Sequence, residues 1–476
     1  MRAHLSNAMY GALEYAAYPI GMLMVAPVML RHLSAAQYGV WAVATAAVST
    51  GSIIASGFGD ANIQHVATQR SVGDAAALLR AVRSTMGIHL VLGAAVALAV
   101  WVLAPYLAQH VGSSAAATRS SCLWSLRIAG LVTLVRAIES VCISTQRAFE
   151  RYGAAVRVSV LARMLALGAA AALAGAGYGV ATIMSATALL SLIGLWLQLV
   201  HLKKLLHADS LAPSFDQAAT RALFAFGIFS WIQAVSGVIF GQADRLIAGA
   251  SLGATAVASY ALCAQMAQPI YGFTAAALHF LFPYLAQQRG KASHDALQRA
   301  VMIALMANVL FVAAGVAILL LYGDRVLQAW GGDVISNGAR RVFVPIVWSS
   351  ALLALNVTGT YALLGLGRVR VVTWLNLGGG LTMLLLIMRL LPHYGGYGMA
   401  TARLCYGPVT LLLYIPLVIA LRTGPNSETG NRETTSANDP SSASVQRSAV
   451  QKVLSRSGGY RVMTSARMPE ERGRTL

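Results

Sequence analysis

The stretch Gly-Tyr-Gly-Val-Ala-Thr at residues 177–182 recurs as Gly-Tyr-Gly-Met-Ala-Thr at residues 396–401, an offset of 219 residues. The same offset relates other loop and helix positions: Gln69 and Gln288, Arg70 and Arg289, Arg80 and Arg299, Leu33 and Leu252, Arg151 and Arg370. Because one offset holds from the first loop to the last apolar segment, the chain is predicted to consist of two homologous halves.

The composition of the chain is that of a membrane protein. Of its 476 residues, 57% are hydrophobic and only 11% are charged, whereas soluble globular proteins carry roughly 25% charge. Stretches of about twenty apolar residues recur, each long enough to cross a hydrocarbon core of roughly 30 Å as a helix. The sequence therefore predicts an all-α integral membrane protein.

The apolar segments predict about twelve spans. They are expected near residues 8–30, 37–60, 84–107, 120–145, 156–176, 178–201, 221–243, 255–282, 298–322, 341–365, 371–391 and 396–421. This divides the chain into an N-terminal six-helix lobe at 1–202, a linker at 203–220, a C-terminal six-helix lobe at 221–421 and a tail at 422–476. The tail is polar and basic and lacks apolar periodicity, so it is expected to be disordered.

The net charge of +19 is explained by membrane topology rather than by nucleic-acid binding. With the N-terminus inside, the predicted inner loops hold fifteen basic residues against seven in the outer loops, before nine in the tail are counted. Positive loops stay in the cytoplasm, so both termini and the linker are predicted to be cytoplasmic. Six spans per half make the repeats parallel, an arrangement in which a central site forms between the halves.

Paired polar positions of the two halves mark candidates for that central site. The 219-residue offset pairs Glu14 with Gln233, Asp60 with His279, and His89 with Asn308. These side chains either share a polar face or satisfy local helix contacts. The acidic residues Glu14, Asp60, Glu139 and Asp244, with Gln233 and His279, are the candidates for ion coupling or for a polar cavity.

Charged residues inside the spans are the candidates for substrate binding, because each costs about 2.5–3.5 kcal/mol at a helix centre unless it is paired or wet. Arg136 is the deepest, and Glu139 lies three residues on, on the same helix face. The two form either a self-neutralising ion pair or an anion site that Glu139 tunes. Arg127, Arg163 and Arg403 also lie within spans, and each either reaches the membrane interface or lines a cavity.

Enzyme machinery is not evident in the sequence. There is no P-loop, HExxH motif or nucleophile elbow, and the four cysteines lack metal-ligand spacing. No loop is long enough for a catalytic domain outside the membrane. We therefore expect no metal, no cofactor and no enzymatic activity, and a transporter is favoured.

Two regions carry a family resemblance. The first has Pro27, then Arg31-His32-Leu33-Ser34, Tyr38-Gly39, Trp41 and Gly57-Phe58-Gly59; the second has Ala243-Asp244-Arg245-Leu246-Ile247, Leu252-Gly253, Tyr260 and Pro283. They resemble the openings of the two halves of the polysaccharide-transport family of bacterial flippases. These are Wzx-type O-antigen and exopolysaccharide flippases, in the superfamily that also holds MATE-type multidrug exporters and the lipid II flippase. The resemblance covers residues 1 to about 421.

The resemblance implies a function in polysaccharide biosynthesis at the bacterial inner membrane. Such proteins flip oligosaccharides linked to undecaprenyl diphosphate from the cytoplasmic to the periplasmic leaflet by alternating access. The cavity would hold the diphosphate and sugars, with Arg136, Arg163, Arg127 and Arg403 as the available cations, while the polyprenyl tail stays in lipid. Membrane lipids, and the polysaccharide polymerase and chain-length regulator of the same pathway, are the implied partners.

Two other functions remain open at this stage. One is an ion-coupled small-molecule or multidrug exporter, which the few acidic residues of the spans disfavour as a site for cationic drugs. The other is a membrane-embedded polysaccharide polymerase or acyltransferase, which the internal duplication and the short loops disfavour.

Overall fold

The computed structural model describes residues 2–112, 115–288 and 294–423, and within these ranges all regular structure is helical. Met1–Ile419 form one compact unit, and Ala420 begins a second. The predicted disordered tail at residues 422–476 lies outside the described residues, except for the last two residues of α14.

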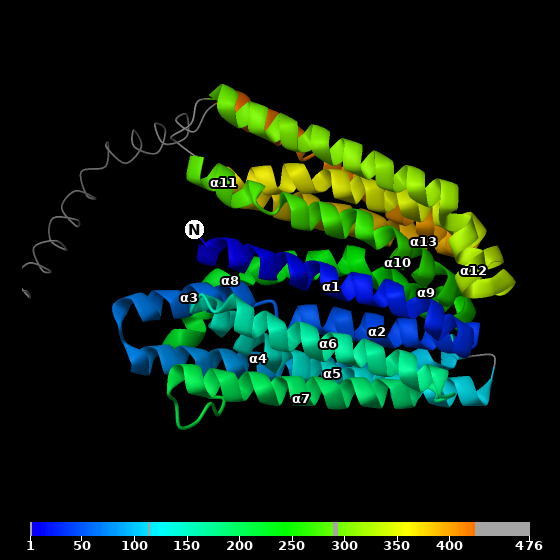
Figure 1. Cartoon of the computed structure of the whole chain (residues 1–476), viewed down its shortest axis with the longest axis horizontal. Helices are drawn as coiled ribbons and strands as arrows, with labels where there is room; N and C mark the ends of the chain where they lie inside the picture. The colour runs from blue at the N-terminus through cyan, green and yellow to red at the C-terminus, as the bar shows by residue number, and fades with distance from the viewer. Residues whose placement is uncertain (1, 113–114, 289–293, 424–476) are drawn as a thin grey trace, which may run out of the picture. The chain divides into compact units, whose positions relative to one another are not determined.

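The helices fall into two groups, which we call the N-lobe and the C-lobe. The N-lobe consists of α1 (Arg2–His32), α2 (Ala35–Ala55), α3 (Gly59–Val72), α4 (Ala75–Val111), α5 (Ala116–Ala148), α6 (Tyr152–Gly175) and α7 (Val180–Leu206). The C-lobe consists of α8 (Gln217–Val238), the π-helical turn η1 (Ile239–Ala243), α9 (Asp244–Leu252), α10 (Ala254–Leu278), α11 (Leu281–Gln288), α12 (His294–Gly365), α13 (Val369–Leu411) and α14 (Tyr414–Thr423). In Figure 1, α1 and α10 lie side by side between the rest of the two lobes.

Of two long helical runs, α12 holds the ninth and tenth predicted spans, and α13 holds the eleventh and most of the twelfth, which continues into α14. The runs change direction at Gly332 (φ 64°) and Gly395 (φ 54°), where the backbone is not helical. Glycine adopts positive φ at little cost because it has no Cβ, so these two residues break the runs. By length and hydropathy, six helices of the described chain qualify as membrane spans, α12 and α13 among them. The chain is thus a multi-pass membrane protein, while the number of twelve spans stays a prediction.

Helix starts reproduce the internal repeat. α2 begins at Ala35 and α10 at Ala254, and α4 begins at Ala75 and α12 at His294, both pairs 219 residues apart. The matched residues His89 and Asn308 also play the same part. His89 Nδ1 lies 3.0 Å from the carbonyl oxygen of Ala137, and Asn308 Nδ2 donates to the carbonyl oxygen of Ala354 at 3.0 Å. Both contacts reach a neighbouring helical segment of the same lobe, as the alternative of local helix contacts predicts, while Nε2 of His89 and Oδ1 of Asn308 have no partner among the described residues.

The lobes meet closely where α2 and α10 begin, a contact that we call the first seam. A Cβ atom on Gly39 would lie 1.8 Å from the carbonyl oxygen of Ala254, so only glycine allows this approach. Nearby, the hydroxyl of Tyr38 donates to Oε1 of Gln265 at 2.9 Å. Apolar side chains of both lobes fill the space around these residues as one buried cluster.

A second seam joins α8 to α2 and α3 at the other end of α2. The indole N–H of Trp231 donates to the carbonyl oxygen of Ile54 at 2.8 Å. Gly57 packs against the Trp231 ring and Gly227 against Phe58, each at distances that leave no room for a Cβ. The lobes are therefore in contact at both ends of α2.

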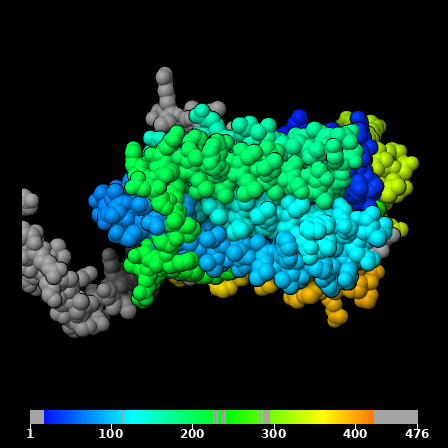
Figure 2. All heavy atoms as spheres, turned by 90° about the horizontal axis from the view of Figure 1, so that it is seen from below, coloured from blue at the N-terminus to red at the C-terminus, as the bar shows by residue number. Residues whose placement is uncertain are grey.

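The outer faces of the helices are apolar. Figure 2 shows the face of the N-lobe where α4, α5 and α7 pack together. On these helices Leu98, Val102, Leu189 and Trp196 are each at least 60% exposed. A soluble protein would bury such side chains, so this face suits contact with acyl chains.

Candidate functional site

Three neighbouring cavities run from one lobe to the other. We call them the N-lobe cavity (about 270 Å³), the middle cavity (about 170 Å³) and the C-lobe cavity (about 350 Å³). The first two share Tyr18, Ser49 and Ile53 in their linings. The last two share three residues of η1, α9 and α10: Gln242, Arg245 and Gln268. Polar space thus extends between the lobes, in the stretch that the two seams enclose.

The N-lobe cavity is cationic. Arg136 on α5 and Arg163 on α6 both line it, with Glu139 one turn beyond Arg136. Nη1 of Arg136 lies 3.7 Å from Oε2 of Glu139, an ion pair longer than a hydrogen bond. The Nε atoms of Arg136 and Arg163 are buried and have no hydrogen-bond partner among the described residues. Among the described side chains, two guanidinium groups against one carboxylate give this lining a net positive charge.

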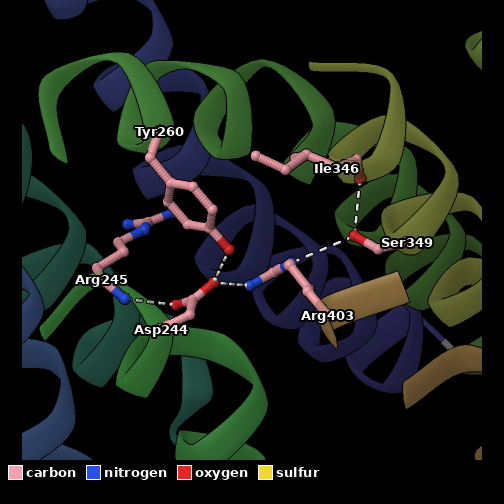
Figure 3. Close-up of polar contacts among 6 residues, drawn as sticks. All are labelled: Asp244, Arg245, Tyr260, Ile346, Ser349 and Arg403. Atoms are coloured by element: carbon pink, nitrogen blue, oxygen red, sulfur yellow. Dashed lines mark hydrogen bonds and ion pairs between the residues drawn. The ribbon is translucent and has the colours of Figure 1, made fainter. Parts of the chain in front are cut away.

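The C-lobe holds a different arrangement, centred on Asp244 at the junction of η1 and α9. Figure 3 shows Arg403 of α13 and Tyr260 of α10 both pointing at its carboxylate. The Tyr260 hydroxyl donates to Oδ2 of Asp244 at 2.8 Å, and Nη1 of Arg403 contacts the same oxygen. The backbone N–H of Arg245 donates to the other carboxylate oxygen, Oδ1, at 2.8 Å. Nε of Arg403 also donates to Ser349 at 3.2 Å. The Arg403 and Asp244 charges therefore offset each other, and both side chains are buried.

Arg245 corrects the sequence prediction, which placed it in an outer loop. The helical run from α8 continues through η1 and α9 to Leu252, nine residues beyond the predicted end of that span. Arg245 is only 8% exposed, lines the middle and C-lobe cavities, and has a buried Nε with no partner among the described residues. One feature of the sequence does point to the longer helix: the adjacent charges of Asp244 and Arg245 are followed by a further apolar run to Leu252.

The other predicted site residues are scattered. Arg127 lines none of these three cavities; its guanidinium stacks on the rings of Trp101 and Trp124, at 4.9 and 5.2 Å from their centroids. Asp60 is exposed in the first turn of α3. His279 is exposed after α10, with its ring 5.6 Å from that of Tyr361.

Two further predicted site residues are Glu14 on α1 and Gln233 on α8. The structure describes the helices at these positions but not the two side chains. Within the part of the chain that the structure describes, no three His, Cys, Asp or Glu residues group as a metal site would require.

Helical lobes enclosing a polar cavity define the class of the protein as a membrane protein with the fold of known transporters. Three solved structures share that fold. An inward-facing multidrug resistance MATE family transporter of the MOP superfamily matches with a TM-score of 0.67 and 15% identity, over 87% of this chain and 99% of its own. The lipid II flippase MurJ, in an inward closed conformation, matches with a TM-score of 0.67 and 11% identity, over 88% of this chain and 87% of its own. A eukaryotic MATE transporter matches with a TM-score of 0.61 and 16% identity, over 87% of this chain and 95% of its own.

The family itself follows from the sequence. The family model described as "Polysaccharide biosynthesis protein" matches residues 28–330, and the chain belongs to this family. No curated protein matches the chain by sequence. The family confirms the resemblance identified from the two motif regions.

Proposed function

We propose that the chain is a flippase that moves undecaprenyl-diphosphate-linked oligosaccharides from the cytoplasmic to the periplasmic leaflet of a bacterial inner membrane. The observation that carries the proposal is the gathering of Arg136, Arg163 and Arg245 along the cavities between the lobes. Among the described side chains that line the N-lobe and middle cavities, Glu139 is the one acidic group against these three cations.

Phosphate chemistry explains why arginines are needed there. A diphosphate linked to sugar and lipid carries a negative charge on each phosphate and cannot cross hydrocarbon unaided. Arginine stays charged and offers paired N–H donors that match phosphate oxygens. The unpartnered Nε atoms of the three arginines supply donors in a space that water and a head group can share.

The two seams supply the gates of an alternating-access cycle. The cavities lie between them, so opening the second seam would admit the head group from the cytoplasm and opening the first would release it to the periplasm. A membrane potential that is negative inside favours outward movement of an anion by about 2.3 kcal/mol per charge for each 100 mV. The polyprenyl tail stays in lipid throughout.

A small-molecule exporter is the second candidate, because two of the three similar structures are described as MATE transporters. Exporters of cationic drugs require acidic residues that are available to the drug. Here the Asp244 carboxylate is engaged by Arg403 and Tyr260, and Glu139 lies beside Arg136. The site therefore favours an anionic substrate, and transport is favoured over an enzymatic reaction.

Vesicles that contain the purified protein test the three functions together. The substrate is a polyprenyl-diphosphate-linked oligosaccharide placed in one leaflet, and an impermeant glycosidase reports its arrival in the other. We expect transfer that empty vesicles lack, with the glycolipid chemically unchanged by mass spectrometry. Uptake of a cationic dye without glycolipid transfer would establish the exporter instead, and chemical conversion of the glycolipid would establish an enzyme.

A further inference from the structure

The C-lobe cavity differs in chemistry from the cationic cavity beside it. Its lining is rich in amides and hydroxyls, which come from η1, α10, α12 and α13: Gln242, Gln268, Ser350, Asn356, Thr360 and Asn376. The tyrosines Tyr271, Tyr361 and Tyr406 add ring surface to the same walls. Its two arginines are Arg403, which is paired with Asp244, and Arg245, which it shares with the middle cavity. With Asp244 counted against Arg403, the remaining positive charge of the described lining is that of Arg245 on the side shared with the middle cavity, and the rest of the lining is polar and uncharged.

Three amide oxygens of this lining lack partners. Oε1 of Gln242, Oδ1 of Asn356 and Oδ1 of Asn376 are buried, and none has a hydrogen bond within the described chain. Asn356 is only 3% exposed. Leaving such groups unpaired is costly, so they mark positions where a ligand or water completes the hydrogen bonding.

The type of partner follows from what an amide offers. Each amide presents an acceptor and a donor from one side chain. An ionised phosphate only accepts hydrogen bonds, so it cannot satisfy the amide oxygens. A hydroxyl both donates and accepts, and sugar rings carry several hydroxyls on an otherwise compact body. Polar groups set among aromatic rings are also the usual lining of a site for a small organic ligand.

We infer that the C-lobe cavity is the saccharide subsite, in which Asn356, Asn376, Gln242 and Gln268 bind the hydroxyls of the lipid-linked sugar. This inference rests on the proposed function and divides its substrate between the lobes. The diphosphate lies along Arg136, Arg163 and Arg245, and the sugar extends past Arg245 into the C-lobe. The shared lining of Arg245, Gln242 and Gln268 is the point at which the two subsites join.

Binding measurements with two ligands on the intact protein test the division. One ligand is a short-chain polyprenyl diphosphate, and the other is the same lipid carrying an oligosaccharide. The variants are Asn356→Leu and Asn376→Leu, which remove the amide but keep the branching and the number of side-chain heavy atoms, at a buried and a half-buried position. Gln64→Leu, on the exposed face of α3, is the matched control.

We expect each amide variant to weaken binding of the glycosylated lipid by about tenfold and to leave binding of the bare diphosphate unchanged. The control should change neither. Equal weakening of both ligands, or undiminished binding of the glycosylated lipid by both variants, would overturn the sugar subsite while leaving the flippase in place. Failure of the unmodified protein to bind either lipid would instead overturn the proposed function, and this inference with it. Thermal unfolding of each variant shows whether it is still folded. If one variant is unfolded, the binding data of the other amide variant decide whether the sugar subsite exists.

Discussion

Arg136 and Arg403 are both placed within the membrane by helices, one in each lobe, but their surroundings differ. Arg403 contacts the Asp244 carboxylate and donates to Ser349. Arg136 lies 3.7 Å from its carboxylate, and its Nε has no partner among the described residues. The same residue type thus serves two purposes: in the C-lobe it completes a buried network, and in the N-lobe it faces a cavity with bonding capacity to spare.

The largest effect is expected from breaking the C-lobe pair. Asp244→Asn leaves the Arg403 guanidinium buried without its counter-charge, which should reduce stability by about 3–5 kcal/mol. Thermal unfolding of the purified protein measures the loss. The matched change in the N-lobe, Glu139→Gln, should lower stability by about 1 kcal/mol or less, because its partner is more distant and 15% exposed. Equal losses in the two lobes would remove the distinction between them.

The next largest effect is on transport, from Arg136→Ala. Losing a charge-assisted hydrogen bond to phosphate costs about 1.5–3 kcal/mol, so glycolipid transfer in vesicles should fall by about tenfold to a hundredfold, well beyond the fall in the Glu139→Gln variant, which breaks the same ion pair but keeps the cation. Arg163→Ala should behave alike. A variant of Arg136 that retains full transfer would refute the anion site in the N-lobe.

The sequence was sufficient for the fold because membrane helices leave a strong signal. Every predicted span falls on helical segments, although several ends were misplaced: α4 begins at Ala75 rather than near residue 84, and α13 ends at Leu411 rather than near residue 421. The second span was predicted to run to Asp60 but ends at Ala55, and the seventh was ended before Arg245 although the helical run continues to Leu252. Hydropathy averages over a window, so it registers the charges of Asp244 and Arg245 as the end of a span, although their burial depends on contacts with Arg403 and Tyr260.

The sequence also could not distinguish the arginines from one another. The sequence shows only how far each arginine lies from the end of its predicted span, and by that criterion four arginines look alike: Arg127, Arg136, Arg163 and Arg403. Whether an arginine meets a carboxylate 159 residues away, as Arg403 does, or two tryptophans, as Arg127 does, depends on how the helices pack. Pairing across such a sequence distance has no local signature.

A smaller effect is expected from crowding the first seam. Gly39→Val forces a side chain against the Ala254 backbone, and overpacking of this kind costs about 1–3 kcal/mol. The lobes should separate there, so that a cysteine at Ser49 in the cavities reacts faster with an impermeant thiol reagent added from the side where α2 begins. Gly168→Val, at a position where a Cβ meets nothing, should leave the rate unchanged. Equal rates in the two variants would show that the first seam is not a gate.

The smallest effect is expected from Arg127→Ala, and it tests the comparison most sharply. Arg127 was grouped with the binding arginines by sequence, but its guanidinium stacks on Trp101 and Trp124, both about half exposed. An exposed cation–π contact contributes about 0.5–1 kcal/mol, so Arg127→Ala should lower thermal stability slightly and change glycolipid transfer by less than about twofold. Arg127→Lys, which keeps the charge, should recover the stability. If Arg127→Ala instead impairs transfer as severely as Arg136→Ala, the substrate path must include the surface around Trp101. Lining the cavities between the lobes would then not be what separates the arginines that take part in transport from the others.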